Sequence, residues 1–106
     1  MTGSLQDILA EFRAALEAIY GARLKKLVLY GSQARGDATD ESDIDVLVVL
    51  EGPVKPGTEV RRCNEAVSDI SLEHDTLLSA FFVSEEEYRT EQSPFLMNVR
   101  REGVPL

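Results

Sequence analysis

The sequence has little of what marks disulfide-bonded, secreted or membrane proteins. It contains one cysteine, which excludes a disulfide within the chain. No apolar run approaches the length needed to cross a bilayer, and the N-terminus lacks the basic and apolar regions of a signal peptide. We therefore expect a cytoplasmic protein that has no contact with a membrane.

Positive charge is scarce as well. Lysine and arginine number 11 against 19 aspartates and glutamates, which gives a formal net charge of −8 at pH 7. Binding to a nucleic-acid backbone normally needs a basic surface that displaces counterions, so direct binding to nucleic acid is not expected. The acidity fits a basic protein partner, and it equally fits a solvated surface that only keeps the protein soluble.

The length predicts one domain over residues 1–106. A chain of 106 residues can bury a substantial core, but it leaves little room for a separate substrate-binding domain. Hydrophobic residues make up 43% and charged residues 28%, which is ordinary for a globular protein, and no repeat or low-complexity tract appears.

Apolar periodicity and capping residues predict the order α-β-β-α-β-α-α. The expected elements are a helix over 5–20, strands over 24–30 and 43–50, a helix capped by Thr58, a strand over 75–83, a helix from Ser84 to about 91, and a helix from Pro94 to about 101. This order predicts an α+β fold with a short mixed sheet and helices mainly on one side.

Two of the predicted helices carry apolar faces. Val60, Cys63, Val67 and Ile70 form the expected buried face of the helix after Thr58. In the last helix we expect Phe95 and Val99 to close the core. The adjacent Arg100 and Arg101 are expected on the surface, where they would contact a triphosphate or an acidic patch of a partner.

The stretch from Gly31 to Asp45 joins the first two strands and carries the candidate chemistry. Gly31 gives backbone freedom at a sharp turn, and Ser32 offers a hydroxyl and an N–H at the start of a short helical turn, which suits a phosphate. Asp43 and Asp45 alternate along the second strand, so their carboxylates emerge on one face and could share a cation. Phosphoryl and nucleotidyl transfer need this combination.

The same stretch resembles the GSxARG…SDxD signature of the DNA polymerase β-type nucleotidyltransferase superfamily. The matching residues are Gly31-Ser32, Ala34-Arg35-Gly36 and Ser42-Asp43-Ile44-Asp45. The chain is most similar to the minimal nucleotidyltransferase (MNT) branch, whose members are about this short and often act as antitoxins beside HEPN-domain toxins. The superfamily fold agrees with the predicted one.

The resemblance implies a site for two Mg²⁺ ions and ATP. The expected metal ligands and catalytic residues are Asp43, Asp45 and Asp75, of which Asp75 begins the predicted third strand, as the third acid does in the family. Gly31 and Ser32 are expected to hold the outer phosphates of the nucleotide.

Other polar residues near the motif have less specific roles. Arg35 is predicted to bind nucleotide, although pairing with Asp37 or Asp40 on the surface is an equal alternative. Ser42 is expected to order the loop before the second strand by bonding to the backbone. His74, the only histidine, is assigned no role.

The resemblance implies a Mg²⁺-dependent antitoxin enzyme that transfers AMP from ATP to a tyrosine of a HEPN toxin within a hetero-oligomer. Two alternatives stay open. One is an antitoxin without catalysis that binds the toxin and occludes it. The other is nucleotidyl transfer to a small molecule such as an aminoglycoside.

Overall fold

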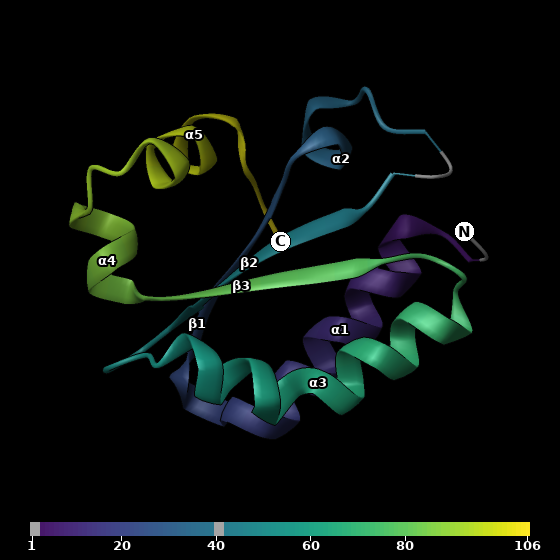
Figure 1. The fold of residues 1–106 in the computed structure, drawn as a ribbon, viewed down its shortest axis with the longest axis horizontal. Coiled ribbons are helices and arrows are strands. Elements are labelled where there is room, and N and C mark those ends of the chain that lie inside the picture. Colours follow the sequence, from purple (N-terminus) through teal and green to yellow (C-terminus); the bar gives the residue numbers. More distant parts are fainter. Residues whose placement is uncertain (1–2, 40–41) are drawn as a thin grey trace.

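A four-stranded sheet forms the centre of the computed structural model, which describes residues 3–39 and 42–106 (Figure 1). The strands are β1 (Leu24–Tyr30), β2 (Ile44–Leu50), β3 (Leu78–Ser84) and β4 (Val104–Pro105), in the order β3-β2-β1-β4. β2 runs antiparallel to β1 and parallel to β3, and β4 runs antiparallel to β1. The sheet is therefore mixed, as predicted.

Helices cover both faces of this sheet, the longer ones on the same face. They are α1 (Leu5–Tyr20), α2 (Ser32–Arg35), α3 (Pro56–Glu73), α4 (Glu85–Thr90) and α5 (Pro94–Glu102), with a 3₁₀ turn over Gly21–Arg23. Figure 1 shows α1 and α3 below the sheet and α4 and α5 above it. The predicted α+β class is confirmed, but helices mainly on one side are found only for the two long helices, since α4 and α5 cover the other face.

β2 is the centre of the core and is packed on both faces. Ile44, Val46 and Val48 are fully buried against the α1 and α3 side, whereas Leu47 and Val49 are fully buried against the α5 side. Burying each such side chain stabilises the folded state by about 1.5–3 kcal/mol relative to leaving it exposed. The alternation places Asp45, which lies between Ile44 and Val46, on the α5 side of the sheet.

Side-chain caps fix two helix starts where the sequence predicts them. The backbone N–H of Asp7 donates to Ser4 Oγ at 3.0 Å, and the N–H of Glu87 donates to Ser84 Oγ at 3.0 Å. Glu87 completes a capping box by accepting the Ser84 N–H at 3.0 Å.

The start of α3 differs from the prediction. The helix begins at Pro56 with Lys55 as its N-cap, so the prediction that Thr58 caps it is wrong. Proline suits the first helical position because its fixed φ matches the helix and no N–H is needed there. Cys63 and Ile70 are buried as expected, but Val60 is 50% exposed.

Glu59 takes a buried place in α3 that its charge did not suggest. It is 3% exposed, accepts a hydrogen bond from the Tyr20 hydroxyl at 2.9 Å, and pairs with Arg62 at 3.3 Å. Burial, reinforced by hydrogen bonds to Cys63 and Glu59, raises the pKa of Tyr20 far above its usual range, so the hydroxyl stays protonated and donates. These contacts explain how a carboxylate is accommodated between α1 and α3.

The third strand starts later than predicted. β3 begins at Leu78, so the prediction that Asp75 opens it is wrong. Ser71 holds the intervening turn, because its carbonyl accepts the Thr76 N–H at 3.1 Å and its hydroxyl accepts the Leu78 N–H at 3.1 Å. Asp75 has a φ of 50° in this turn.

The C-terminal segment closes the other face of the sheet. Val99 is 2% exposed, as predicted, but Phe95 is 37% exposed, so the expectation that it is buried in the core is wrong. Gly103 ends α5, and its N–H donates to the Val99 carbonyl. The two-residue β4 follows and was not predicted, because two residues carry no strand periodicity. No helix of the described residues is long and apolar enough to cross a membrane.

The two adjacent arginines of α5 have different surroundings. Arg100 donates to the backbone carbonyls of Tyr88 and Glu91, each at 2.7 Å, and so ties α5 to the end of α4. Arg101 is 71% exposed at its side chain, and it donates hydrogen bonds to Asn98 and Glu102 of its own helix. Arg100 therefore has a structural contact that the sequence did not indicate, and the contact of both arginines with a triphosphate or a partner stays a prediction.

We predict that Arg100→Ala lowers the free energy of unfolding by about 1–3 kcal/mol, because two charged hydrogen bonds to backbone are lost. Arg101→Ala is the matched control and should stay within about 0.5 kcal/mol of the wild type. Urea unfolding of the three proteins measures both values. Equal stabilities of the two variants would contradict the assignment of Arg100 to the α4–α5 connection.

Candidate functional site

At the Gly31 turn, which follows β1, the backbone contacts the side chain of Asp45. Gly31 has φ 75° and ψ −157°, a conformation that residues other than glycine rarely adopt. A Cβ atom at this position would lie 2.4 Å from Asp45 Oδ2. The Asp45 carboxylate therefore lies directly against the Gly31 backbone, in space that any other residue would fill.

A short helical turn follows, as predicted. The N–H groups of Ala34 and Arg35 both donate to the Gly31 carbonyl at 3.1 Å, and α2 ends at Gly36. Ser32, the first residue of α2, directly follows the glycine that contacts Asp45. The structure thus brings three predicted site residues together: Gly31, Ser32 and Asp45.

The two motif aspartates belong to the same face of the sheet. Asp45 pairs with Tyr30 across β1 and β2, and Asp43 comes directly before β2 with the same alternation. Burial raises the pKa of Asp45, the nearby Asp43 raises it further, and Arg35 lowers it. Asp43 is exposed and Asp45 is partly buried, and two neighbouring carboxylates that repel each other are suited to a shared cation.

Arg35 lies close to this pair, but its guanidinium group pairs with two other acids. Its Nε is 3.4 Å from Asp37 Oδ2, so one of the two predicted surface pairings is formed. Its Nη1 is also 3.9 Å from Glu102 Oε2 at the end of α5. Asp40, the other predicted surface partner, lies outside the described residues.

Sequence reasoning missed Glu102 as a neighbour of the motif. No local signal could reveal it, because Glu102 lies on the last helix and reaches Arg35 only through the tertiary fold. Ser42 was identified correctly, since its Oγ accepts the Thr39 N–H at 2.9 Å and orders the loop before β2.

Asp75 is not brought to this site. It is exposed in the turn after α3, three residues before β3 begins, and its N–H donates to the Leu72 carbonyl at 3.4 Å. α3 packs on the face of the sheet opposite to Asp45. The position across from Asp45 on β3 is Ser79.

His74 makes a hydrogen bond away from the motif. Its Nε2 contacts the Glu11 carboxylate of α1 and lies 3.9 Å from Glu73 Oε2. The ligand atoms of these three residues lie within 4.8 Å of one another, and the group joins α1 to the end of α3. A hydrogen bond between two helices explains this arrangement without a metal.

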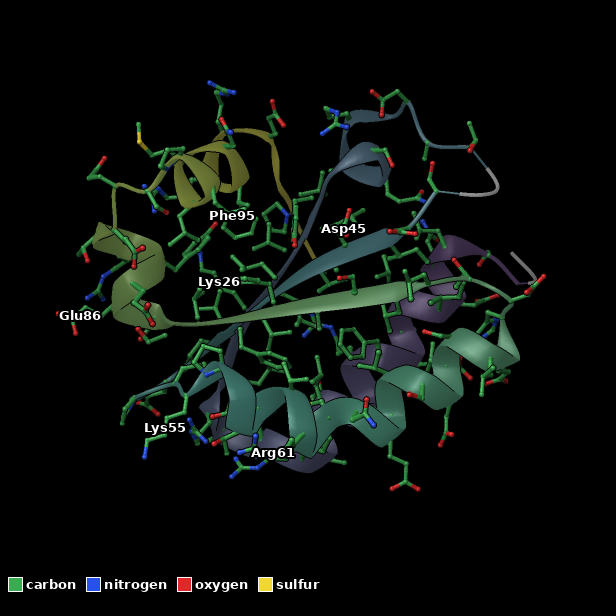
Figure 2. The ribbon with its side chains drawn as sticks, viewed as in Figure 1. Lys26, Asp45, Lys55, Arg61, Glu86 and Phe95 are labelled. Atoms are coloured by element: carbon green, nitrogen blue, oxygen red, sulfur yellow. The ribbon has the colours of Figure 1, made fainter. Side chains whose placement is uncertain are left out.

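Aromatic side chains border the carboxylates on the α5 side. Figure 2 shows Phe95 beneath α5, on the same side of the sheet as Asp45. The ring of Phe95 meets Tyr30 edge-on at 5.4 Å and packs on Phe81 at 4.9 Å. Phe81 is 48% exposed, so this cluster forms an open aromatic surface beside the site.

Known proteins identify the family of this chain. A model described as "Nucleotidyltransferase domain" matches residues 9–97. The chain belongs to the nucleotidyltransferase family. The predicted family and the predicted enzyme class, a nucleotidyltransferase, are thereby confirmed.

Two relatives from Methanocaldococcus jannaschii match over nearly the whole chain. "Putative protein adenylyltransferase MJ0604" is 38% identical over 92% of this chain and 93% of the relative. "Putative protein adenylyltransferase MJ0141" is 31% identical over 92% of this chain and 94% of the relative.

Solved structures share the fold of this nucleotidyltransferase. One, "Crystal structure of the toxin-antitoxin with AMP-PNP", has a TM-score of 0.64 at 18% identity, and the match covers 91% of this chain and 69% of the solved chain. A toxin-antitoxin MntA-HpeT mutant has a TM-score of 0.59 at 19% identity and covers 99% of this chain and 72% of its own. At these identities the likeness concerns the fold alone.

We predict that Gly31→Ala destabilises the protein more than Gly36→Ala. Both glycines have positive φ, which costs about 1–3 kcal/mol for alanine, but only at Gly31 would the new Cβ meet another atom, Asp45 Oδ2. Urea unfolding measures the difference. The excess cost at Gly31 should shrink in an Asp45→Ala background, and an unchanged excess there would contradict the contact.

We also predict that Asp45→Asn raises the melting temperature at pH 7 in buffer without divalent cations. The pKa of Asp45 is raised in the folded state, so ionising it costs stability as the pH rises from about 4, where an unfolded aspartate titrates. Below that pH the wild type and variant should converge. Melting curves from pH 3 to 8 test this, and a constant difference across that range would contradict it.

Proposed function

We propose that this nucleotidyltransferase transfers AMP from ATP to a tyrosine of a HEPN-type toxin and so acts as an antitoxin. The observation that supports the proposal is that Asp43 lies close enough to Asp45 to perturb its pKa, while Asp45 itself lies against the Gly31 turn with Ser32 next to it. Family membership gives the reaction class.

The carboxylates of Asp43 and Asp45 fit a divalent cation, since oxygen ligands suit Mg²⁺, and burial together with the nearby Asp43 raises the pKa of Asp45 when no cation is present. When bound, Mg²⁺ would offset the negative charge of the triphosphate. Gly31 and Ser32 would contact the outer phosphates, and Arg35 could reach the same phosphates from α2. The second Mg²⁺ that the family resemblance implies would require ligands beyond these two aspartates.

The chemistry that follows is an in-line displacement. The tyrosine oxygen of the acceptor attacks the α-phosphorus of ATP, forms a new phosphoester bond and loses its proton to solvent. The bond from that phosphorus to the oxygen shared with the β-phosphate breaks, so pyrophosphate leaves and the tyrosine carries AMP. The task of the chain is to position the phosphates and to hold the charge that accompanies them.

Two findings favour a protein acceptor. The relatives with 38% and 31% identity are named protein adenylyltransferases, and similar folds occur in toxin-antitoxin structures. A net charge of −8 would favour association with a basic toxin.

A second candidate function is neutralisation by binding alone. It is favoured by the position of Asp75 outside β3, which leaves Ser79 rather than an acid across from Asp45. In this case the toxin would be blocked by occlusion, and no AMP would be transferred.

We predict that Asp43→Asn and Asp45→Asn each reduce AMP transfer at least about 100-fold. The assay incubates the chain with a HEPN-type toxin and ATP labelled at the α-phosphate, and mass spectrometry locates the AMP. Asp69→Asn is the control, because Asp69 is an exposed acid of α3.

Retained transfer in both motif variants would contradict the proposed site. Absence of transfer by the wild type, together with full neutralisation of the toxin, would favour the binding mechanism.

A further inference from the structure

Ser79 lies beside Asp45 in the sheet. β2 and β3 are parallel, and their register pairs Asp45 with Ser79. Neighbouring strands are about 4.7–4.9 Å apart, so side chains at paired positions on one face are adjacent.

The alternation along β3 places Ser79 on the face that carries Asp45. Leu78 and Phe82 belong to the core formed with α1 and α3, whereas Val83 belongs to the core formed with α5. Phe81 packs on Phe95 of α5, which confirms the same alternation. Ser79 is partly buried on this α5 face.

This position is where β3 could contribute a ligand to the cation site. Two divalent cations held close together would repel each other, and a third carboxylate between them would offset that repulsion and add ligand oxygens to those of the phosphates and water. The residues of β3 on the site face are Ser79, Phe81 and Val83, and none of them is an acid. A serine hydroxyl is neutral and adds no negative charge between two ions.

We propose that Ser79 occupies the position of a third carboxylate, and that the chain's own side chains consequently hold one divalent cation with the nucleotide. The inference rests on the proposed function in that Asp43 and Asp45 hold the cation. It makes residue 79 the position that sets the number of ions. An acid there would lie beside Asp45 and complete a three-carboxylate site.

The test compares the wild type, Ser79→Asp and Ser79→Asn, which has the size of aspartate without its charge. Each protein is mixed with Mn²⁺ and an ATP analogue that has a methylene bridge between the α- and β-phosphates. Native mass spectrometry counts the ions in each complex. We expect one ion with the wild type and Ser79→Asn, and two with Ser79→Asp.

Melting temperatures give a second readout that needs no nucleotide. Without divalent cations, Ser79→Asp should melt below Ser79→Asn, because a third carboxylate repels Asp45. Mn²⁺ should raise the melting temperature of Ser79→Asp more than that of Ser79→Asn, since binding to the folded state stabilises it.

Two ions in the wild-type complex would overturn the proposal, even if Ser79→Asp does not fold. A single ion in a folded Ser79→Asp complex would overturn it as well, and so would equal melting of the two variants with and without Mn²⁺. If the analogue does not bind the wild type, the proposed function fails, but the melting comparison still decides whether residue 79 lies at the carboxylate pair.

Discussion

The contact between the Gly31 backbone and the Asp45 carboxylate is the constraint on which the site depends. It requires a glycine with positive φ at the end of β1 and an aspartate at the paired end of β2. Because Ser32 starts α2 at the same turn, the contact brings a possible phosphate ligand next to the carboxylates. A side chain at residue 31 would separate the two parts of the site.

The rest of the fold holds this contact in place, although the charged Asp45 carboxylate lowers the stability of the folded protein. Burial and Asp43 raise the pKa of Asp45, so the charged carboxylate is less stable in the folded protein than in water. The strand that carries it is otherwise buried on both faces, by α1 and α3 on one side and α5 on the other. A packed central strand thus offsets the unfavourable charge, and a bound cation would offset it further.

Local signals in the sequence were enough to predict most elements and the core of the motif. These signals involve residues close in sequence: the periodicity of α1, the Ser84 capping box, and the spacing of Gly31, Asp43 and Asp45. The errors at Asp75 and Glu102 arise from tertiary structure: Ser71 delays the start of β3, and α5 folds back to bring Glu102 to Arg35. Parallel register is also a tertiary property, so the pairing of Ser79 with Asp45 could not be predicted.

Asp43, Asp45 and the Gly31 turn together form the proposed cation and nucleotide site. A crystal structure of the wild type with Mn²⁺ and the methylene-bridged ATP analogue would locate the ion by anomalous scattering. We expect an anomalous peak bound by Asp43 and Asp45, with phosphate oxygens against Gly31 and Ser32. A nucleotide bound elsewhere, or Mn²⁺ found only at Glu11 and His74, would be incompatible with this site.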